Sequence, residues 1–150
     1  MPSRFLVADR PDIQHYFLQM IDLVASRSTC GRRRVGAIIT DEQGHVLSMG
    51  YNGVPSGIEH CLDFPCEGID DRSGDTSRCL AVHAEQNAIV QCHRLDLAWV
   101  IYTTSFPCFT CAKLIANTKI QRVVYRETYA ETLGFDLLDR IGLELVQVPK

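Results

Sequence analysis

Two short motifs constrain this chain more than any other feature, His83-Ala84-Glu85 and Pro107-Cys108-Phe109-Thr110-Cys111. His83, Cys108 and Cys111 are side chains that bind zinc, and three protein ligands leave the fourth position of a tetrahedral zinc ion open for water. Glu85 remains as a carboxylate that the metal does not need. The motifs therefore predict a catalytic metal site that the fold must assemble from two distant segments.

The spacing of the ligands sets a geometric condition on that site. Cys108 and Cys111 are three residues apart, so a helix places them on one face. Pro107 suits a helix start, where the helix dipole favours thiolate over thiol. His83 and Glu85 are about 200° apart around a regular helix, so both reach one site only if His83 lies in the cap or first turn. The alternative is a structural zinc or a pair of buried thiols beside an unrelated glutamate.

Length and composition predict one soluble globular domain over residues 1–150. Hydrophobic residues make up 46% of the 150 residues and charged residues 22%, and the net charge is −3. This balance disfavours a general nucleic-acid binder but permits a small anionic substrate. Met1–Arg10 has no signal-peptide core and no apolar run is long enough to span a bilayer, so we expect a cytoplasmic protein without a membrane partner. An odd count of 7 cysteines then favours metal ligation over disulfides.

Apolar periodicity gives the expected elements. Helices are predicted at Asp9–Ser26 (with Asp9 as N-cap), Val82–Leu95, Cys108–Asn117 and Glu131–Ile141, and strands at Val35–Thr40, His45–Tyr51, Ala98–Thr104, Gln121–Arg126 and Leu143–Val148. The first two strands form an edge hairpin, and the later alternation of helices and strands predicts helices on both faces of a sheet. Ile89, Val90 and Cys92 are expected in the core. Asn52–Leu80 is a long loop, which its cysteines mark as functional.

The sequence resembles the deoxycytidylate (dCMP) deaminases of the cytidine deaminase superfamily, especially the short phage and bacterial members. H-x-E with P-C-x-x-C is shared by zinc nucleobase deaminases in general. The G-Y-N-G-x-P-x-G segment is more specific to the dCMP deaminases. The stretches that carry the resemblance are Val35–Ile39, Gly50–Gly57, His60-Cys61, His83–Ile89 and Pro107–Lys113.

This resemblance implies a three-layer α/β/α fold around a five-stranded mixed sheet. It also implies hydrolysis of dCMP to dUMP and ammonia, which supplies dUMP for thymidylate synthesis. His83, Cys108 and Cys111 correspond to the ligands of the catalytic zinc. Glu85 corresponds to the residue that carries a proton from water to the ring nitrogen and then to the departing amine.

The resemblance extends to substrate and effector contacts. Asn52 would contact the nucleotide sugar, the backbone from Thr104 to Phe106 would meet the pyrimidine, and Tyr129 would assist at the phosphate. The family pattern implies a homohexamer that dCTP activates and dTTP inhibits, each with Mg²⁺. The residues assigned to this effector site are Arg34, Tyr51 and Gly53. The run Arg32–Arg34 suits phosphate oxygens, although such a run is equally a solvated strand entry.

A second, structural zinc is also implied. Cys30 and Cys61 match two positions of that site, Cys66 and Cys79 are the natural candidates for the others, and His60 is an alternative ligand. The alternative is that these four cysteines are buried or free thiols that bind no metal.

Two other classes of function share the central motifs. A tRNA adenosine deaminase or other polynucleotide deaminase should show a basic groove, and neither it nor a nucleoside deaminase explains G-Y-N-G-x-P-x-G. A non-enzymatic zinc module, acting as a nucleotide sensor or in DNA uptake, would have no use for Glu85.

Overall fold

A five-stranded mixed sheet forms the centre of the molecule in this computed structural model, which describes residues 10–70 and 77–150. β1 (Gly36–Thr40) and β2 (Val46–Tyr51) form an antiparallel hairpin, and β1 pairs antiparallel with β3 (Val100–Ser105) on its other side. β4 (Arg122–Glu127) and β5 (Glu144–Gln147) continue in parallel. The strand order is β2-β1-β3-β4-β5, so the predicted mixed sheet with its edge hairpin is confirmed.

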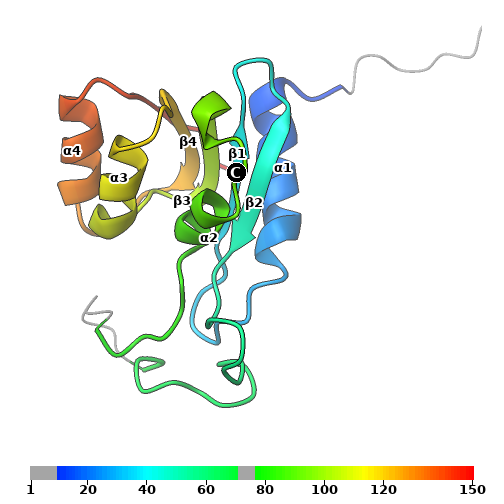
Figure 1. The fold of residues 1–150 in the computed structure, drawn as a ribbon, viewed down its shortest axis with the longest axis vertical. Coiled ribbons are helices and arrows are strands. Elements are labelled where there is room, and N and C mark those ends of the chain that lie inside the picture. The colour runs from blue at the N-terminus through cyan, green and yellow to red at the C-terminus, as the bar shows by residue number, and fades with distance from the viewer. Residues whose placement is uncertain (1–9, 71–76) are drawn as a thin grey trace, which may run out of the picture.

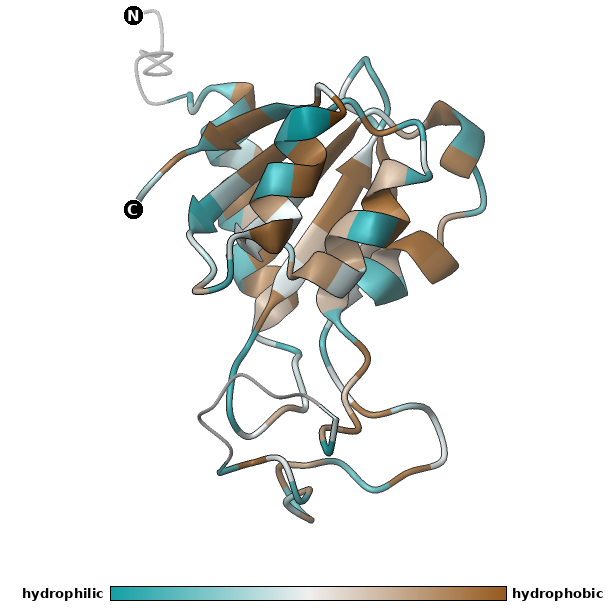
Figure 2. Cartoon of the chain, turned by 90° about the vertical axis from the view of Figure 1, so that its left-hand side faces the viewer, coloured by the Kyte–Doolittle hydropathy of each residue, from teal (hydrophilic) through white to brown (hydrophobic). Residues whose placement is uncertain are grey.

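Helices cover both faces of this sheet (Figure 1). α1 (Ile13–Ala25) lies on one face, and α2 (Ala84–Val90), α3 (Phe109–Ala116) and α4 (Leu133–Arg140) lie on the other. Figure 2 shows apolar residues concentrated on the strands and hydrophilic residues on the outward parts of the helices. The three-layer α/β/α fold expected from the resemblance is therefore confirmed.

α1 packs closely on β1. Phe17, Leu18 and Ile21 are buried against the apolar side chains of β1, β3 and β4. Gly36 permits the close approach, because a Cβ at this position would lie 2.6 Å from the carbonyl oxygen of Ile21. The apolar periodicity that predicts this helix includes Ile13 and Tyr16 as buried residues, and this part was wrong, since they are 54% and 46% exposed.

The start of α1 also differs from the prediction. Asp12 is the N-cap, and its carboxylate accepts a hydrogen bond from the backbone N–H of His15 at 2.9 Å. Because Asp12 satisfies this orphan donor, the helix begins at Ile13 and Pro11 precedes it. Asp9, the predicted N-cap, lies outside the described residues.

α2 is shorter than the predicted Val82–Leu95 helix. It ends at Val90, and a short 3₁₀ helix at Leu95–Leu97 leads into β3. Ala84 and Ala88 face the sheet, which leaves Val90, about 200° further round the helix from Ala88, 81% exposed. Val90 was therefore wrongly placed in the core, whereas Cys92 is buried as predicted.

The segment between β2 and α2 extends away from the sheet (Figure 1). Its described residues contain no helix or strand of more than one residue, which agrees with the predicted long loop. Gly53 forms an isolated antiparallel bridge with Val82, and its backbone N–H donates to the Val82 carbonyl at 3.2 Å. The two ends of the loop are thereby held together next to the start of α2.

Candidate active site

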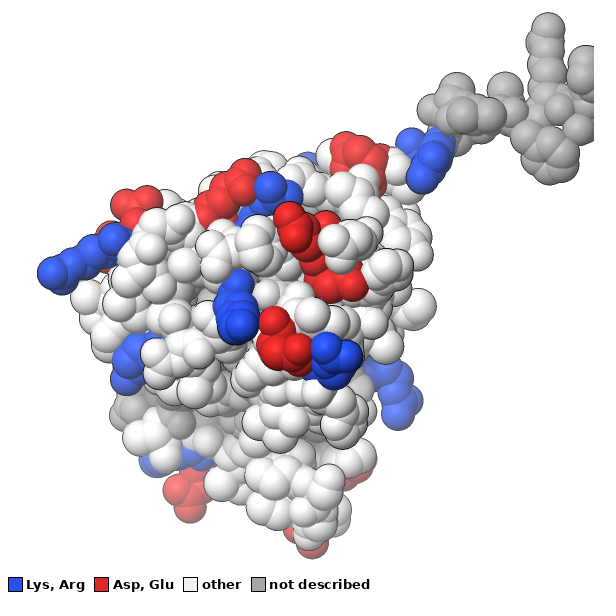
Figure 3. Space-filling model, turned by 45° about the horizontal axis from the view of Figure 1, so that its top comes forward, with Lys and Arg blue, Asp and Glu red and all other residues white. Residues whose placement is uncertain are grey.

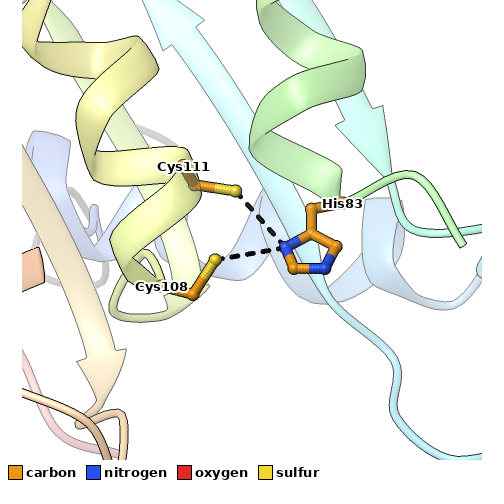
Figure 4. A group of neighbouring side chains, drawn as sticks. All are labelled: His83, Cys108 and Cys111. Carbon is orange, nitrogen blue, oxygen red and sulfur yellow. Dashed lines mark hydrogen bonds between the residues drawn. The ribbon is translucent and has the colours of Figure 1, made fainter. Parts of the chain in front are cut away.

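His83, Cys108 and Cys111 converge on one point, as predicted (Figure 4). The Nδ1 atom of His83 lies 3.4 Å from the Cys108 Sγ and 3.3 Å from the Cys111 Sγ. Among the described residues, this is the only group of three or more His, Cys, Asp or Glu side chains whose ligand atoms all lie within 4.8 Å of one another. The three ligand atoms, one nitrogen and two sulfurs, form a triangle that fits a single metal ion.

The geometric condition on His83 is met because this residue is the N-cap of α2. Its backbone is extended, with φ −71° and ψ 155°, so its side chain leaves the helix before regular winding begins. The Gln86 side-chain oxygen accepts a hydrogen bond from the His83 backbone N–H at 2.8 Å. This contact fixes the cap and leaves Glu85 in the first turn of the helix.

Two glycines allow the helix starts to approach each other. A Cβ at Gly50 of β2 would overlap the Ala84 carbonyl oxygen, so α2 can lie on β2 only at a glycine. A Cβ at Gly134 of α4 would lie 2.7 Å from the Pro107 carbonyl oxygen, in the segment that leads into α3. Cys108 is the N-cap of α3, so both cysteines project from its first turn.

The three ligating groups shift one another's pKa values. Hydrogen bonding from the Cys111 thiol, together with the nearby His83 imidazole, lowers the pKa of Cys108 to about 4. The Cys108 hydrogen bond and burial raise the pKa of Cys111, and the same Cys108 sulfur raises the pKa of His83. One thiolate therefore forms readily while the second thiol keeps its proton. A cation between them is what allows both sulfurs to be thiolates.

Glu85 lies beside this cluster but is not needed as a metal ligand. Glu85 is only 4% exposed, and this burial raises the pKa of its carboxyl group above the ordinary value. Its interaction with the Cys111 thiol places it next to the metal-ligating atoms. A buried carboxyl group with a raised pKa binds a proton more readily than an exposed one, as a group that accepts and donates protons requires.

The donor set fits zinc better than the hard cations. Zinc in catalytic sites takes three protein ligands from nitrogen and sulfur and keeps one position for water, whereas magnesium and calcium prefer oxygen. His83, Cys108 and Cys111 supply that set, and Cys111 is fully buried. These residues would hold the ion, and Glu85 would lie next to its open position.

The site opens into a cavity whose rim carries a cationic side chain. His83, Glu85 and Cys108 line this cavity together with Arg33 and Tyr129, and with Asn52, Ser105 and Phe106. The Arg33 guanidinium lies 5.7 Å from the centre of the Tyr129 ring and donates a hydrogen bond to the Ser105 hydroxyl at 2.7 Å. The place of Arg33 in the cavity was missed in the sequence, although its basic run directly precedes a predicted strand.

Asn52 lies in the cavity wall and joins three segments. Its side-chain oxygen accepts hydrogen bonds from the Ser28 hydroxyl at 2.6 Å and the Val35 N–H at 2.8 Å. Its amide nitrogen donates to the Arg33 carbonyl at 2.7 Å. The end of α1, the entry to β1 and the loop after β2 are thus tied together behind Arg33.

Other residues named from the family pattern are distributed over separate hollows. Thr104 lies outside the catalytic cavity, in a groove that also contains Arg34, and its hydroxyl accepts a hydrogen bond from the Gly36 N–H at 3.2 Å. Tyr51 and Gly53 line a third hollow near the start of α2. The structure therefore brings Tyr51 and Gly53 together but places Arg34 elsewhere.

The four cysteines expected to hold a structural zinc do not form a complete metal site among the described residues. The Sγ atoms of Cys61 and Cys66 lie 3.7 Å apart. Cys30 and Cys79 instead line the catalytic cavity. The structure thus pairs two of the predicted ligands of a structural zinc, and no third described ligand atom lies within 4.8 Å of both, so the second zinc remains a prediction.

Charges of both signs are interspersed over the face drawn in Figure 3. Several cations on the described surface are paired with carboxylates, such as Arg94 with Asp96 at 2.9 Å and Arg122 with Glu144 at 2.6 Å. This face offers no basic stripe of the kind that tracks a nucleic-acid backbone. Within the described ranges, no helix combines the length and the apolar character needed to cross a bilayer.

We predict that Cys111→Ser removes the metal held by His83 and Cys108, because it deletes one of the three ligands that converge there. The matched control is Cys92→Ser, which changes another buried cysteine outside the cluster. Zinc content after equilibration in a metal buffer is the measurement. Equal zinc content in the two variants would show that the cluster is not the binding site.

A model of the cytidine and deoxycytidylate deaminase zinc-binding region matches residues 11–127 of this chain. The deoxycytidylate deaminase of Mycobacterium phage D29 is 42% identical over 123 residues, which are 77% of this chain and 95% of the phage protein. The deoxycytidylate deaminase of Saccharomyces cerevisiae is 35% identical over 142 residues, 92% of this chain but only 45% of the yeast protein. The match thus extends over nearly the whole phage protein.

A solved structure gives the same result. The dCMP deaminase of cyanophage S-TIM5, in complex with dCMP and dUMP, superposes with a TM-score of 0.73 at 30% identity, over 93% of this chain and 98% of that one. The resemblance to phage-type dCMP deaminases is therefore confirmed in sequence and in fold. The chain is a hydrolytic deaminase that belongs to the cytidine and deoxycytidylate deaminase family.

Proposed function

We propose that this chain hydrolyses dCMP to dUMP and ammonia in the cavity at His83, Cys108 and Cys111, with zinc as cofactor. The observation that carries the proposal is Glu85, a buried carboxylate beside three metal-ligating side chains and open to a cavity. A purely structural zinc site has no use for such a carboxylate. We place the reaction in the cytoplasm (the host cytoplasm for a phage protein), where it would supply dUMP for thymidylate synthesis.

The chemistry requires a proton to move from water to the leaving amine. Zinc, when bound, activates the water molecule that attacks the amine-bearing carbon. Glu85 would accept one proton of that water and deliver it to the adjacent ring nitrogen. It would then pass the proton of the added hydroxyl group to the amine, so that the C–N bond breaks, the carbonyl forms and ammonia leaves. Burial raises the pKa of Glu85, so the group can hold the proton between these two transfers.

The cavity wall supports recognition of a nucleoside monophosphate. Ser105 and Phe106, at the end of β3, are placed to meet the pyrimidine, whereas Thr104 contributes only through the adjoining backbone. Asn52 uses one amide hydrogen for the Arg33 carbonyl, which leaves the other for the nucleotide sugar. Arg33 would meet the phosphate, with Tyr129 beneath its guanidinium.

Other functions explain fewer of these features. A nucleoside deaminase has no need for the Arg33 guanidinium at the rim of the cavity. A polynucleotide deaminase should carry a basic surface, but this chain has a net charge of −3. A nucleotide sensor would bind its nucleotide without a reaction, so it would have no use for the Glu85 carboxylate.

Regulation and assembly are part of the same proposal. We propose a homohexamer that dCTP–Mg²⁺ activates and dTTP–Mg²⁺ inhibits, with a second zinc that orders the loop after β2. The hollow lined by Tyr51 and Gly53 lies next to the start of α2, so an effector there would act on the helix that carries His83 and Glu85. The response of dCMP turnover to each effector tests the regulation, and no response would contradict it.

We predict that Glu85→Gln lowers ammonia release from dCMP by about 10²- to 10⁴-fold, the range expected for loss of a general acid–base group. Glu42→Gln, in the exposed turn between β1 and β2, is the matched control and should keep full turnover. Zinc content should be unchanged in both variants, because Glu85 is not one of the three ligands. Retained turnover in Glu85→Gln would exclude the proposed proton carrier.

We predict that Arg33→Gln raises KM for dCMP about tenfold, the loss expected for one charge-assisted hydrogen bond to phosphate. The weak reaction with deoxycytidine, which has no phosphate, should change little. Arg94→Gln removes a charge distant from the cavity and serves as the control. If Arg33→Gln affects dCMP and deoxycytidine equally, Arg33 does not read the phosphate.

A further inference from the structure

A second hollow, here called the arginine groove, adjoins the catalytic cavity between α1 and the ends of β3 and β4. Four cationic side chains among its described lining residues face two anionic ones: Arg33, Arg34, Arg126 and Lys150 against Asp22 and Glu127. Ser105 and Glu127 are paired residues at the carboxyl ends of parallel strands β3 and β4. This is the edge of an α/β sheet at which ligands bind.

The two carboxylates already have partners, so the remaining charge in the groove is positive. Asp22 accepts a hydrogen bond from Arg126 Nη2 at 2.8 Å, and Glu127 lies 3.7 Å from Arg33 Nη2. Arg34 is exposed and makes no hydrogen bond or ion pair with any residue in the described ranges. Its guanidinium is therefore free to bind an anion.

Arg126 adds unused donor capacity in a buried place. Its side chain is 11% exposed, and its Nη2 also donates to the Leu18 carbonyl at 2.6 Å. Its Nε is buried and has no hydrogen-bond partner among the described residues. A buried N–H without an acceptor costs free energy, and Arg126 is among the residues that line the groove.

The groove adjoins the catalytic cavity. Arg33 and Ser105 line both hollows, and the hydrogen bond between them forms the boundary. A phosphate held by Arg33 at the rim of the cavity therefore lies at the entrance to the groove. A further phosphate attached to it would extend toward Arg34.

We propose that the arginine groove is a phosphate subsite, which takes the second phosphate of a pyrimidine nucleotide whose base lies in the catalytic cavity. This inference rests on the proposed function, because that function places the base near Glu85 and the first phosphate at Arg33. The consequence is that pyrimidine nucleoside diphosphates bind in competition with the monophosphate. Arg34 is then the residue that distinguishes the two.

The test compares dUMP with dUDP, which differ by one phosphate and carry no amine to release. Calorimetric titrations of the zinc-loaded protein give both affinities for the wild type, Arg34→Gln and the charge-matched control Arg94→Gln. We expect Arg34→Gln to weaken the affinity for dUDP about tenfold, the loss expected for one charge-assisted hydrogen bond. The affinity for dUMP should fall much less. The control should leave the ratio of the two affinities unchanged.

Several results would overturn the subsite. Equal weakening of dUMP binding and dUDP binding would mean that Arg34 acts only through the overall electrostatic field of the protein. Simultaneous binding of dUDP and dUMP would place dUDP in a separate site. Inorganic pyrophosphate that binds as tightly as dUDP, with the same loss in Arg34→Gln, would assign the groove to free phosphate. Ammonia release from dCMP, measured on the same samples, reports on the proposed function independently of these ratios.

Discussion

The meeting of two helix starts at one point is the constraint on which the rest of the site depends. α2 can lie on β2 because Gly50 has no side chain, and α4 can close on the segment before α3 because of Gly134. The N-caps His83 and Cys108 are thereby brought within reach of each other. The positive ends of both helix dipoles point into the same small volume, which favours thiolates there.

This convergence has an electrostatic consequence that links folding to metal binding. Two buried thiols and an imidazole cannot all lose their protons in contact with one another unless a cation lies between them. Zinc therefore completes the structure as well as the chemistry. Burial of Glu85 beside the same cluster raises the pKa of its carboxyl group, so one packing arrangement prepares both the ligands and the proton carrier.

The sequence predicted those parts of the molecule that local spacing determines. The five strands, the layers and the ligands His83, Cys108 and Cys111 could be read because each motif lies on one short element. Features that depend on contacts between elements could not be predicted from the sequence. Val90 was predicted in the core, but Ala84 and Ala88 are the residues of α2 that face the sheet, which leaves Val90 exposed. Arg33 enters the cavity because Asn52, distant in sequence, binds its carbonyl oxygen.

Anomalous X-ray diffraction at the zinc absorption edge, on crystals of the zinc-loaded protein, tests the central claim most directly. We expect a strong peak among the His83 Nδ1, Cys108 Sγ and Cys111 Sγ atoms, at bonding distance from all three. Glu85 should lie next to the ion without binding it. A peak only at the loop cysteines, or direct ligation by Glu85, would contradict the proposed active site.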